Sequence, residues 1–249
     1  MSKPSLIFAP GAWYPPTAFD PTITKLNELG YSHCHTVAFP SVQQAASVKD
    51  LKPDIEAVRA LVAQEADAGR DVIVVSHSWS GLPVNSALDG LSREEREEEG
   101  KAGGVVRLVF VAAFIPNIGE SLIGAFGGTP PPWYVLDEAS GTLTTTDPYT
   151  LFFHDVPDGK EWAAALKPHS WVTKNTPSTS AAYFFIPTYY LLCEEDRAIP
   201  LAVQQVMVDR ARRKGAEIET EKINTGHTPW LAAPEKFVAY IRRQAGEEV

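Results

Sequence analysis

One segment, Asp71 to Gly81, constrains the fold of this chain more than any other. Its sequence is Asp-Val-Ile-Val-Val-Ser-His-Ser-Trp-Ser-Gly, in which an apolar run typical of a buried strand passes into small residues and then into a helical pattern. A sharp strand-to-helix turn of this kind lifts one side chain above the carboxyl edge of a parallel sheet. Ser78 occupies that position, so the segment predicts an accessible nucleophile in a fold of parallel strands.

The rest of the chain alternates short apolar runs with longer amphipathic stretches, which is typical of parallel strands joined by helices. Strands are expected at residues 5–9, 33–38, 71–76, 105–112, 188–193 and 217–223. Helices are expected at residues 21–29, 53–68, 79–88, 201–214 and 234–244, and the charged segment 92–101 is expected to be a solvated helix face or a loop. The predicted fold class is therefore α/β, a mostly parallel sheet flanked by helices.

Between Pro116 and Pro187 the alternation of strands and helices stops. This region contains a run of prolines at 130–132, a threonine-rich stretch at 142–146 and many aromatic residues. An insertion of this length between two strands is usually functional. We predict that residues of about 117–186 form a cap over the ends of the strands, within a single domain of residues 1–249. A side lobe with its own small core is the alternative.

Composition limits the partners of the chain. The formal charge of −9 and the absence of a long basic run argue against a nucleic-acid surface. No apolar stretch reaches the roughly 20 residues that span a bilayer, and the N-terminus lacks the pattern of a signal peptide. Cys34 and Cys193 give no disulfide framework and are expected to be reduced. We expect a cytoplasmic protein that acts on a small molecule, with no nucleic-acid or membrane partner, and a homodimer is one option for its oligomeric state.

Two later turns carry the residues that a serine nucleophile needs. Residues 191–200 leave a strand into an acidic turn, and residues 224–229 leave the last strand into a turn that contains His227. An imidazole accepts and returns a proton near neutral pH, and a carboxylate can orient it. Asp196 is favoured over the two glutamates that precede it because of its position in the turn. The chain order serine, acid, histidine is that of the α/β-hydrolases.

The chain resembles the α/β-hydrolase superfamily over nearly all its length, and more narrowly the compact branch of plant methylesterases, hydroxynitrile lyases and their fungal or bacterial relatives. The motifs behind the resemblance are Ala9-Pro-Gly-Ala-Trp13, Ser76-His-Ser-Trp-Ser80, Asp196-Arg-Ala-Ile-Pro200 and Gly226-His-Thr-Pro-Trp230. The resemblance implies an α/β-hydrolase fold with an inserted cap and no cofactor. It also implies a catalytic triad of Ser78, Asp196 and His227, and an oxyanion hole made by the backbone amides of Ala12 and Trp79.

Several positions depart from the family pattern. Ser76 and Ser80 stand where the usual elbow has glycine, and Pro10 stands where the family often has histidine. The tight turn demands a small side chain, which serine provides. Hydroxynitrile lyases have a threonine near the position of Gly11 and a lysine after the catalytic histidine. This chain has Gly11 and Thr228 there, which counts against cyanohydrin cleavage.

The predicted function is that of a serine hydrolase cleaving a small or medium apolar or aromatic carboxylic ester or lactone through an acyl-enzyme. The apolar substrate is inferred from the many aromatic residues of the predicted cap, because ligand pockets are largely apolar with a few placed polar groups. The residues expected to bind the substrate are aromatic: Trp13, Tyr14, Trp133, Phe152 and Phe153. Two alternatives stay open. One is a cofactor-free lyase or carbon–carbon bond-cleaving enzyme with the same triad, and the other is a hydrolase-like ligand receptor.

The remaining histidines are not assigned to the catalytic triad. His33 and His35 lie on one face of a strand and have a spacing that can bind metal, but no third ligand is apparent nearby in the sequence, so no metal is expected. His77 is expected to pack or hydrogen-bond, because its direction alternates with that of Ser78. His154 and His169 fall in the predicted cap, where substrate and solvent are equally plausible neighbours.

Overall fold

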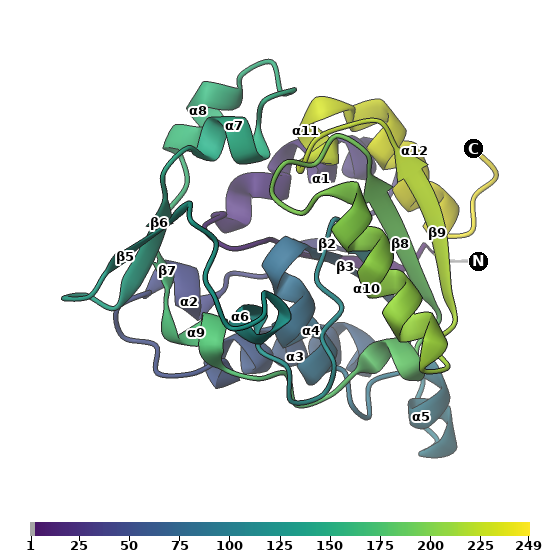
Figure 1. The fold of residues 1–249 in the computed structure, drawn as a ribbon. Coiled ribbons are helices and arrows are strands. Elements are labelled where there is room, and N and C mark those ends of the chain that lie inside the picture. The colour runs from purple at the N-terminus through teal and green to yellow at the C-terminus, as the bar shows by residue number, and fades with distance from the viewer. Residues whose placement is uncertain (1–2) are drawn as a thin grey trace.

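Six parallel strands form the central sheet of the computed structural model, which describes residues 3–249 (Figure 1). The strand order is β2-β1-β3-β4-β8-β9. The strands are β1 (Ser5–Ala9), β2 (Cys34–Thr36), β3 (Asp71–His77), β4 (Gly104–Val111), β8 (Thr188–Cys193) and β9 (Ile218–Ile223). β1 lies between β2 and β3, so the direction in which successive strands are added to the sheet reverses at β1. Because β1 and β3 are parallel neighbours, the segments that follow them leave the sheet side by side at its carboxyl edge.

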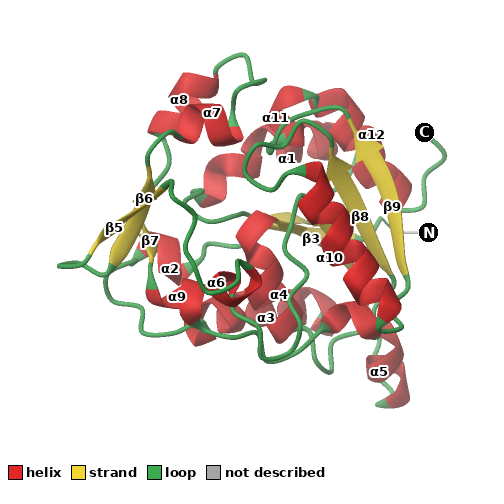
Figure 2. Cartoon of the chain, in the orientation of Figure 1, coloured by secondary structure: helices red, strands yellow, loops and turns green. Residues whose placement is uncertain are grey.

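Helices cover both faces of this sheet, as predicted, which confirms the α/β fold class (Figure 2). The longer ones are α1 (Asp20–Glu28), α3 (Lys52–Asp67), α4 (Gly81–Ala87), α10 (Leu201–Arg213) and α12 (Pro234–Gln244). The shorter ones are η1 (Pro16–Phe19), α2 (Pro40–Gln43), η2 (Ser78–Ser80), α5 (Arg93–Glu98), η3 (Ala182–Phe184) and α11 (Pro229–Ala232). The helix expected at residues 79–88 therefore starts as a 3-10 turn, because the chain turns sharply at Ser78 before α4 can begin.

The region between β4 and β8 forms a small antiparallel sheet and several short helices. Its sheet has the order β5-β6-β7, and the strands are β5 (Tyr134–Asp137), β6 (Thr142–Thr145) and β7 (His169–Ser170). Its helices are α6 (Leu122–Ala125), α7 (Pro148–Phe152), α8 (Gly159–Ala164) and α9 (Val172–Asn175). The threonine-rich stretch is strand β6, because β-branched side chains favour extended backbone. Figure 1 shows this region beside the main sheet, with α7 and α8 above β5–β7.

The two cysteines lie in separate strands of the main sheet. Cys34 is in β2 and Cys193 in β8, and both are unpaired. The strand order places β1, β3 and β4 between them. With neighbouring strands about 4.8 Å apart, this is a separation of roughly 19 Å, far beyond the reach of a disulfide. No helix among residues 3–249 is both long enough and apolar enough to cross a membrane.

Candidate active site

The turn after β3 holds Ser78 in a strained backbone conformation. The φ angle of Ser78 is 56°, in the left-handed region that side chains other than glycine rarely adopt. The carbonyl of Ser78 accepts a hydrogen bond from Phe114 N at 3.0 Å, which ties the turn to the segment after β4. The backbone also packs closely at Gly81, where a Cβ atom would lie 1.9 Å from Phe114 O. The turn therefore needs glycine at position 81, one residue later than in the usual elbow.

The two serines that stand where the usual elbow has glycine are hydrogen-bonded to each other. Ser76 Oγ lies 3.0 Å from Ser80 Oγ. Ser80 Oγ also lies 2.9 Å from the carbonyl oxygens of Ala9 and His77, and it accepts a hydrogen bond from His77 N at 2.9 Å. Both serines are fully buried. The substitution thus adds buried hydrogen bonds between β1 and the turn, which glycines would not supply.

His227 and Asp196 form a buried pair at the carboxyl edge of the sheet. His227 Nδ1 lies 2.7 Å from Asp196 Oδ2, and the other carboxylate oxygen accepts hydrogen bonds from the amides of Ala198 and Ile199. A carboxylate makes His227 Nδ1 the protonated nitrogen, which leaves Nε2 free to act as a base. Of the three acidic residues in this turn, Asp196 is the one that contacts His227, while Glu194 is exposed.

His77 links the turn at Ser78 to His227. Its ring centroid lies 4.5 Å from that of His227, and its Nε2 lies 3.0 Å from the carbonyl oxygen of His227. Burial holds the pKa of His77 well below its usual value, so the ring stays neutral and Nε2 donates this hydrogen bond. No hydrogen bond joins Ser78 Oγ to His227 among the described residues, and such bonds are often long in a site without substrate.

The loop after β1 lies against Ser78. A Cβ atom on Gly11 would lie 2.9 Å from Ser78 Cβ and 2.8 Å from His77 Nδ1, so only glycine fits at this position. Ala12 follows, and Trp13 has a φ angle of 71°. Ala12, Ser78 and Trp79 line one cavity. The role of the Ala12 and Trp79 amides as donors stays a prediction.

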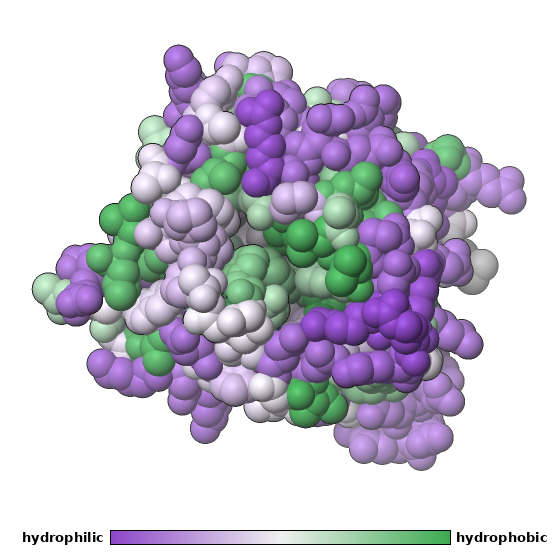
Figure 3. Space-filling model, viewed as in Figure 1, coloured by the Kyte–Doolittle hydropathy of each residue, from purple (hydrophilic) through white to green (hydrophobic). Residues whose placement is uncertain are grey.

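That cavity is narrow, with a volume of about 20 Å³. Its remaining lining residues are mostly aromatic or aliphatic: Trp13, Phe114, Leu122, Phe126, Trp133, Tyr134, Phe152, Ala198 and Ile199. Of the residues predicted to bind substrate, Trp13, Trp133 and Phe152 lie there. Tyr14 and Phe153 lie behind the lining instead, where Tyr14 packs against His77. Figure 3 shows hydrophobic surface around a hollow on the face between the β5–β7 sheet and α10.

The last residue of α7 and the segment that follows it bind the loop on both sides of His227. Asp155 Oδ2 accepts a hydrogen bond from Gly226 N at 2.6 Å, and Thr228 Oγ1 donates one to Phe152 O at 2.9 Å. Sequence reasoning missed Asp155, although it lies in an Asp-Val-Pro-Asp turn. It also missed Phe114, whose contact with the turn at Ser78 depends on the pairing of β3 with β4.

The fold supplies a third polar residue to the His33 and His35 pair. The carboxylate of Glu65 lies 3.9 Å from His33 Nδ1 and 3.3 Å from His35 Nε2. Arg70 Nε lies 2.7 Å from the same carboxylate. Arg70 therefore competes with any metal ion for this carboxylate. The reason given for expecting no metal, the lack of a third ligand, is therefore wrong, because the fold brings Glu65 to both histidines; the expectation of no metal itself stays a prediction.

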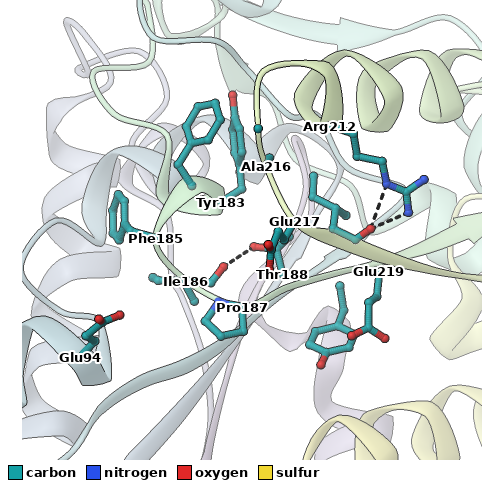
Figure 4. Close-up of a pocket in the computed structure, with 14 residues that line it drawn as sticks. Glu94, Tyr183, Phe185, Ile186, Pro187, Thr188, Arg212, Ala216, Glu217 and Glu219 are labelled. Carbon is teal, nitrogen blue, oxygen red and sulfur yellow. Dashed lines mark hydrogen bonds between the residues drawn. The ribbon is translucent and has the colours of Figure 1, made fainter.

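A wider groove of about 630 Å³ lies at the opposite, amino edge of β8 and β9 (Figure 4). Pro187 and Thr188 form its floor, and Glu217 and Glu219 form part of its wall. The Arg212 guanidinium donates hydrogen bonds to the carbonyl oxygen of Ile218. The groove shares no lining residue with the cavity at Ser78, and its named side chains form no nucleophile–base pair.

Comparison with known proteins finds relatives over the whole chain. The profile of the Alpha/beta hydrolase family matches residues 6–240. The protein "Alpha/beta hydrolase nvfD" of Aspergillus novofumigatus is 32% identical over 254 residues, which covers 100% of this chain and 99% of that protein. The "Probable hydrolase R7" of a Phoma species is 29% identical over 266 residues, covering 99% and 100%.

Solved structures share the fold at lower identity. A pyrethroid hydrolase from Sphingobium faniae has a TM-score of 0.77 at 18% identity and covers 98% of this chain and 97% of that one. Polyneuridine aldehyde esterase has a TM-score of 0.76 at 16% identity, covering 98% and 100%. Tomato methylketone synthase I has a TM-score of 0.77 at 14% identity, covering 99% of each chain.

Proposed function

Because this chain belongs to the α/β-hydrolase family, we propose that it is a serine hydrolase that cleaves a small or medium apolar or aromatic carboxylic ester or lactone. The observation that carries the proposal is the buried hydrogen bond between His227 Nδ1 and Asp196 Oδ2, next to a serine held at positive φ. The names of the relatives support it, since two are called hydrolases and one structural neighbour is called an esterase.

The proposed reaction begins with attack of Ser78 Oγ on the carbonyl carbon of the substrate. His227 Nε2 takes the hydroxyl proton as the new carbon–oxygen bond forms, because an alcohol is a weak nucleophile until a base removes its proton. The same proton then passes to the leaving alcohol, and an acyl-enzyme remains. Water repeats the sequence and releases the acid. Asp196 orients the imidazole and stabilises its charged form.

The charge that develops on the carbonyl oxygen needs fixed donors. The backbone amides of Ala12 and Trp79 are the proposed pair, because their residues border the cavity beside Ser78. Donors of this kind act in a site without bulk water and need no reorganisation during the reaction. Removal of one donor typically costs about 3 to 4 kcal/mol of barrier.

The lining of the cavity supports an apolar substrate, because apart from Ser78 it consists mainly of aromatic and aliphatic side chains. Its volume of about 20 Å³ is far below the roughly 300–1,000 Å³ of ligand pockets. Trp133 and Tyr134, from the region between β4 and β8, are part of this lining. We therefore propose that the region acts as a cap whose displacement admits the substrate.

The test compares wild-type protein with Ser78→Ala on nitrophenyl acetate and nitrophenyl butyrate, with labelling by a fluorophosphonate probe. We expect turnover and labelling in the wild type, and loss of both in a folded Ser78→Ala variant. Ser47→Ala, a change at an exposed serine, is the matched control and should behave as wild type. Turnover by Ser78→Ala would refute the mechanism. Labelling without turnover, or aldehyde release without acid, would favour the receptor or lyase alternatives.

A further inference from the structure

Four polar side chains without solvent exposure lie next to the candidate active site. Ser41 comes from α2, Asp54 from α3, His169 from β7 and Lys174 from α9, and each has an exposed fraction of 0%. Burial of a lysine and an aspartate is costly unless hydrogen bonds and opposite charge compensate for lost water. The four residues therefore have to be explained together.

The four residues form one hydrogen-bonded chain, in which the last link uses the backbone amide of Ser41. Lys174 Nζ lies 2.5 Å from His169 Nδ1, His169 Nε2 lies 2.7 Å from Ser41 Oγ, and the Ser41 amide donates to Asp54 Oδ1 at 3.0 Å. Because the lysine amine has hydrogens to donate, His169 Nδ1 accepts and His169 Nε2 donates to Ser41. Burial lowers the pKa of Lys174, and the charge of Asp54 acts in the opposite direction.

One end of this chain touches two tryptophans. Lys174 Nζ lies 4.5 Å from the ring centroid of Trp79 and 5.4 Å from that of Trp13. The ring of His169 is perpendicular to both indoles, with centroids 4.4 Å from Trp79 and 6.2 Å from Trp13. Lys174 and His169 thus hold the two indoles relative to each other, although the tryptophans are far apart in sequence.

These tryptophans border the proposed oxyanion hole. Trp13 follows Ala12, and Trp79 follows Ser78 and carries the other amide. Trp13 and Ser78 both have positive φ angles, of 71° and 56°. Such conformations cost about 1 to 3 kcal/mol each and persist only where the surroundings fix them. Contacts that fix the two indoles therefore also fix the direction of the two amides.

We propose that Lys174 is a positioning residue for the two oxyanion-hole amides and acts through the indole rings of Trp13 and Trp79. The inference rests on the proposed hydrolase function. Lys174 does not line the cavity at Ser78 and has no exposed surface, so it orients the site without touching substrate.

The experiment replaces Lys174 with methionine, which keeps most of the volume and removes the amine. We expect kcat for nitrophenyl butyrate to fall by about 10- to 100-fold with KM within threefold of wild type, because small displacements of catalytic groups cost this much and the cavity lining is unchanged. Labelling of Ser78 by the fluorophosphonate should slow by a similar factor. Lys160→Met is the matched control, since this exposed lysine of α8 also lies near an aromatic ring, that of Tyr149.

A folded Lys174→Met protein with wild-type kcat and labelling rate would overturn the inference, as would a raised KM with unchanged kcat. If Lys174→Met does not fold, Ser41→Ala decides the matter, because it removes one oxygen and leaves His169 Nε2 without its partner. A kcat lower by about threefold or more is expected there, and an unchanged kcat would also overturn the inference. Failure of the proposed function looks different, because wild-type protein itself would then neither turn over esters nor label at Ser78.

Discussion

At the scale of single residues, backbone strain gathers around the candidate site. Trp13, Ser78 and Ala112 are the residues other than glycine with positive φ in the described part of the chain. They lie just after β1, β3 and β4, which are neighbours in the sheet. Strain of this kind persists where the surrounding structure fixes it, and it concentrates at sites that bind or react.

The first prediction concerns the carboxylate that contacts His227. Asp196→Asn keeps the shape of the side chain but favours the wrong tautomer of the imidazole, so we expect kcat to fall by about 10⁴-fold with little change in fold. Steady-state kinetics with nitrophenyl butyrate and circular dichroism measure the two effects. Glu194→Gln is the control in the same turn and should keep wild-type kcat. Activity of Asp196→Asn above a tenth of wild type would exclude the orienting role.

The second prediction concerns the loop after β1. Gly11→Ala places a Cβ atom 2.8 Å from His77 Nδ1 and 2.9 Å from Ser78 Cβ, so the loop has to move away from the hydroxyl. We expect kcat to fall by at least about 100-fold, which is the loss typical of one missing oxyanion donor. Gly124→Ala in α6 is the control, because its nearest neighbour is the Ser121 hydroxyl at 3.2 Å. Equal kinetics for both variants would contradict the tight contact.

At the scale of elements, the main sheet could be predicted from the sequence to within a few residues. The strands at 5–9 and 188–193 and the helix at 234–244 were predicted with the bounds that the structure gives. Long apolar or amphipathic runs ended by glycine or proline decide these elements locally. The short strands between β4 and β8 could not be predicted, because strands as short as His169–Ser170 exist only through pairing with a neighbour.

The third prediction tests the contact of the segment after α7 with the loop of His227. Asp155→Ala removes the acceptor of the Gly226 amide. Hydrogen bonds to charged groups contribute about 2 kcal/mol, so we expect that loss in the free energy of unfolding and a fall in kcat of about tenfold. Urea unfolding and ester kinetics measure them. Asp158→Ala, at an exposed aspartate nearby, is the control. If Asp155→Ala matched this control in both measurements, the contact would have no role.

At the scale of the whole molecule, buried histidines link stability to pH. Burial lowers the pKa of His77 and of His169 well below 6.5, so below that pH the unfolded chain binds protons that the folded chain does not. Burial also raises the pKa of Asp54 to about 6, which acts in the opposite direction between that pH and its ordinary value. Burial also lowers the pKa of Lys174, which acts in the same direction as the histidines. The unfolded state therefore binds more protons than the folded state, and stability rises with pH in this range.

The fourth prediction follows from this balance. The free energy of unfolding should fall as the pH is lowered from 6.5 to 5. Urea titrations at pH 7.5, 6.5, 5.5 and 5.0 measure this slope. His77→Gln removes one of the two histidines and should make the slope shallower than in the wild type. A wild-type stability that does not decline over this range would show that the buried histidines become protonated in the folded state.

The sequence by itself determined the order of strands and helices, the turn that projects Ser78 and the chain order of serine, acid and histidine. Each of these depends on residues close together in the chain, where periodicity and turn chemistry act directly. Only the tertiary structure decided that Asp196 is the acid that meets His227, that Tyr14 and Phe153 lie behind the cavity, and that Lys174 reaches Trp13 and Trp79. Those contacts join segments from different strands, and the packing of the whole sheet brings them together.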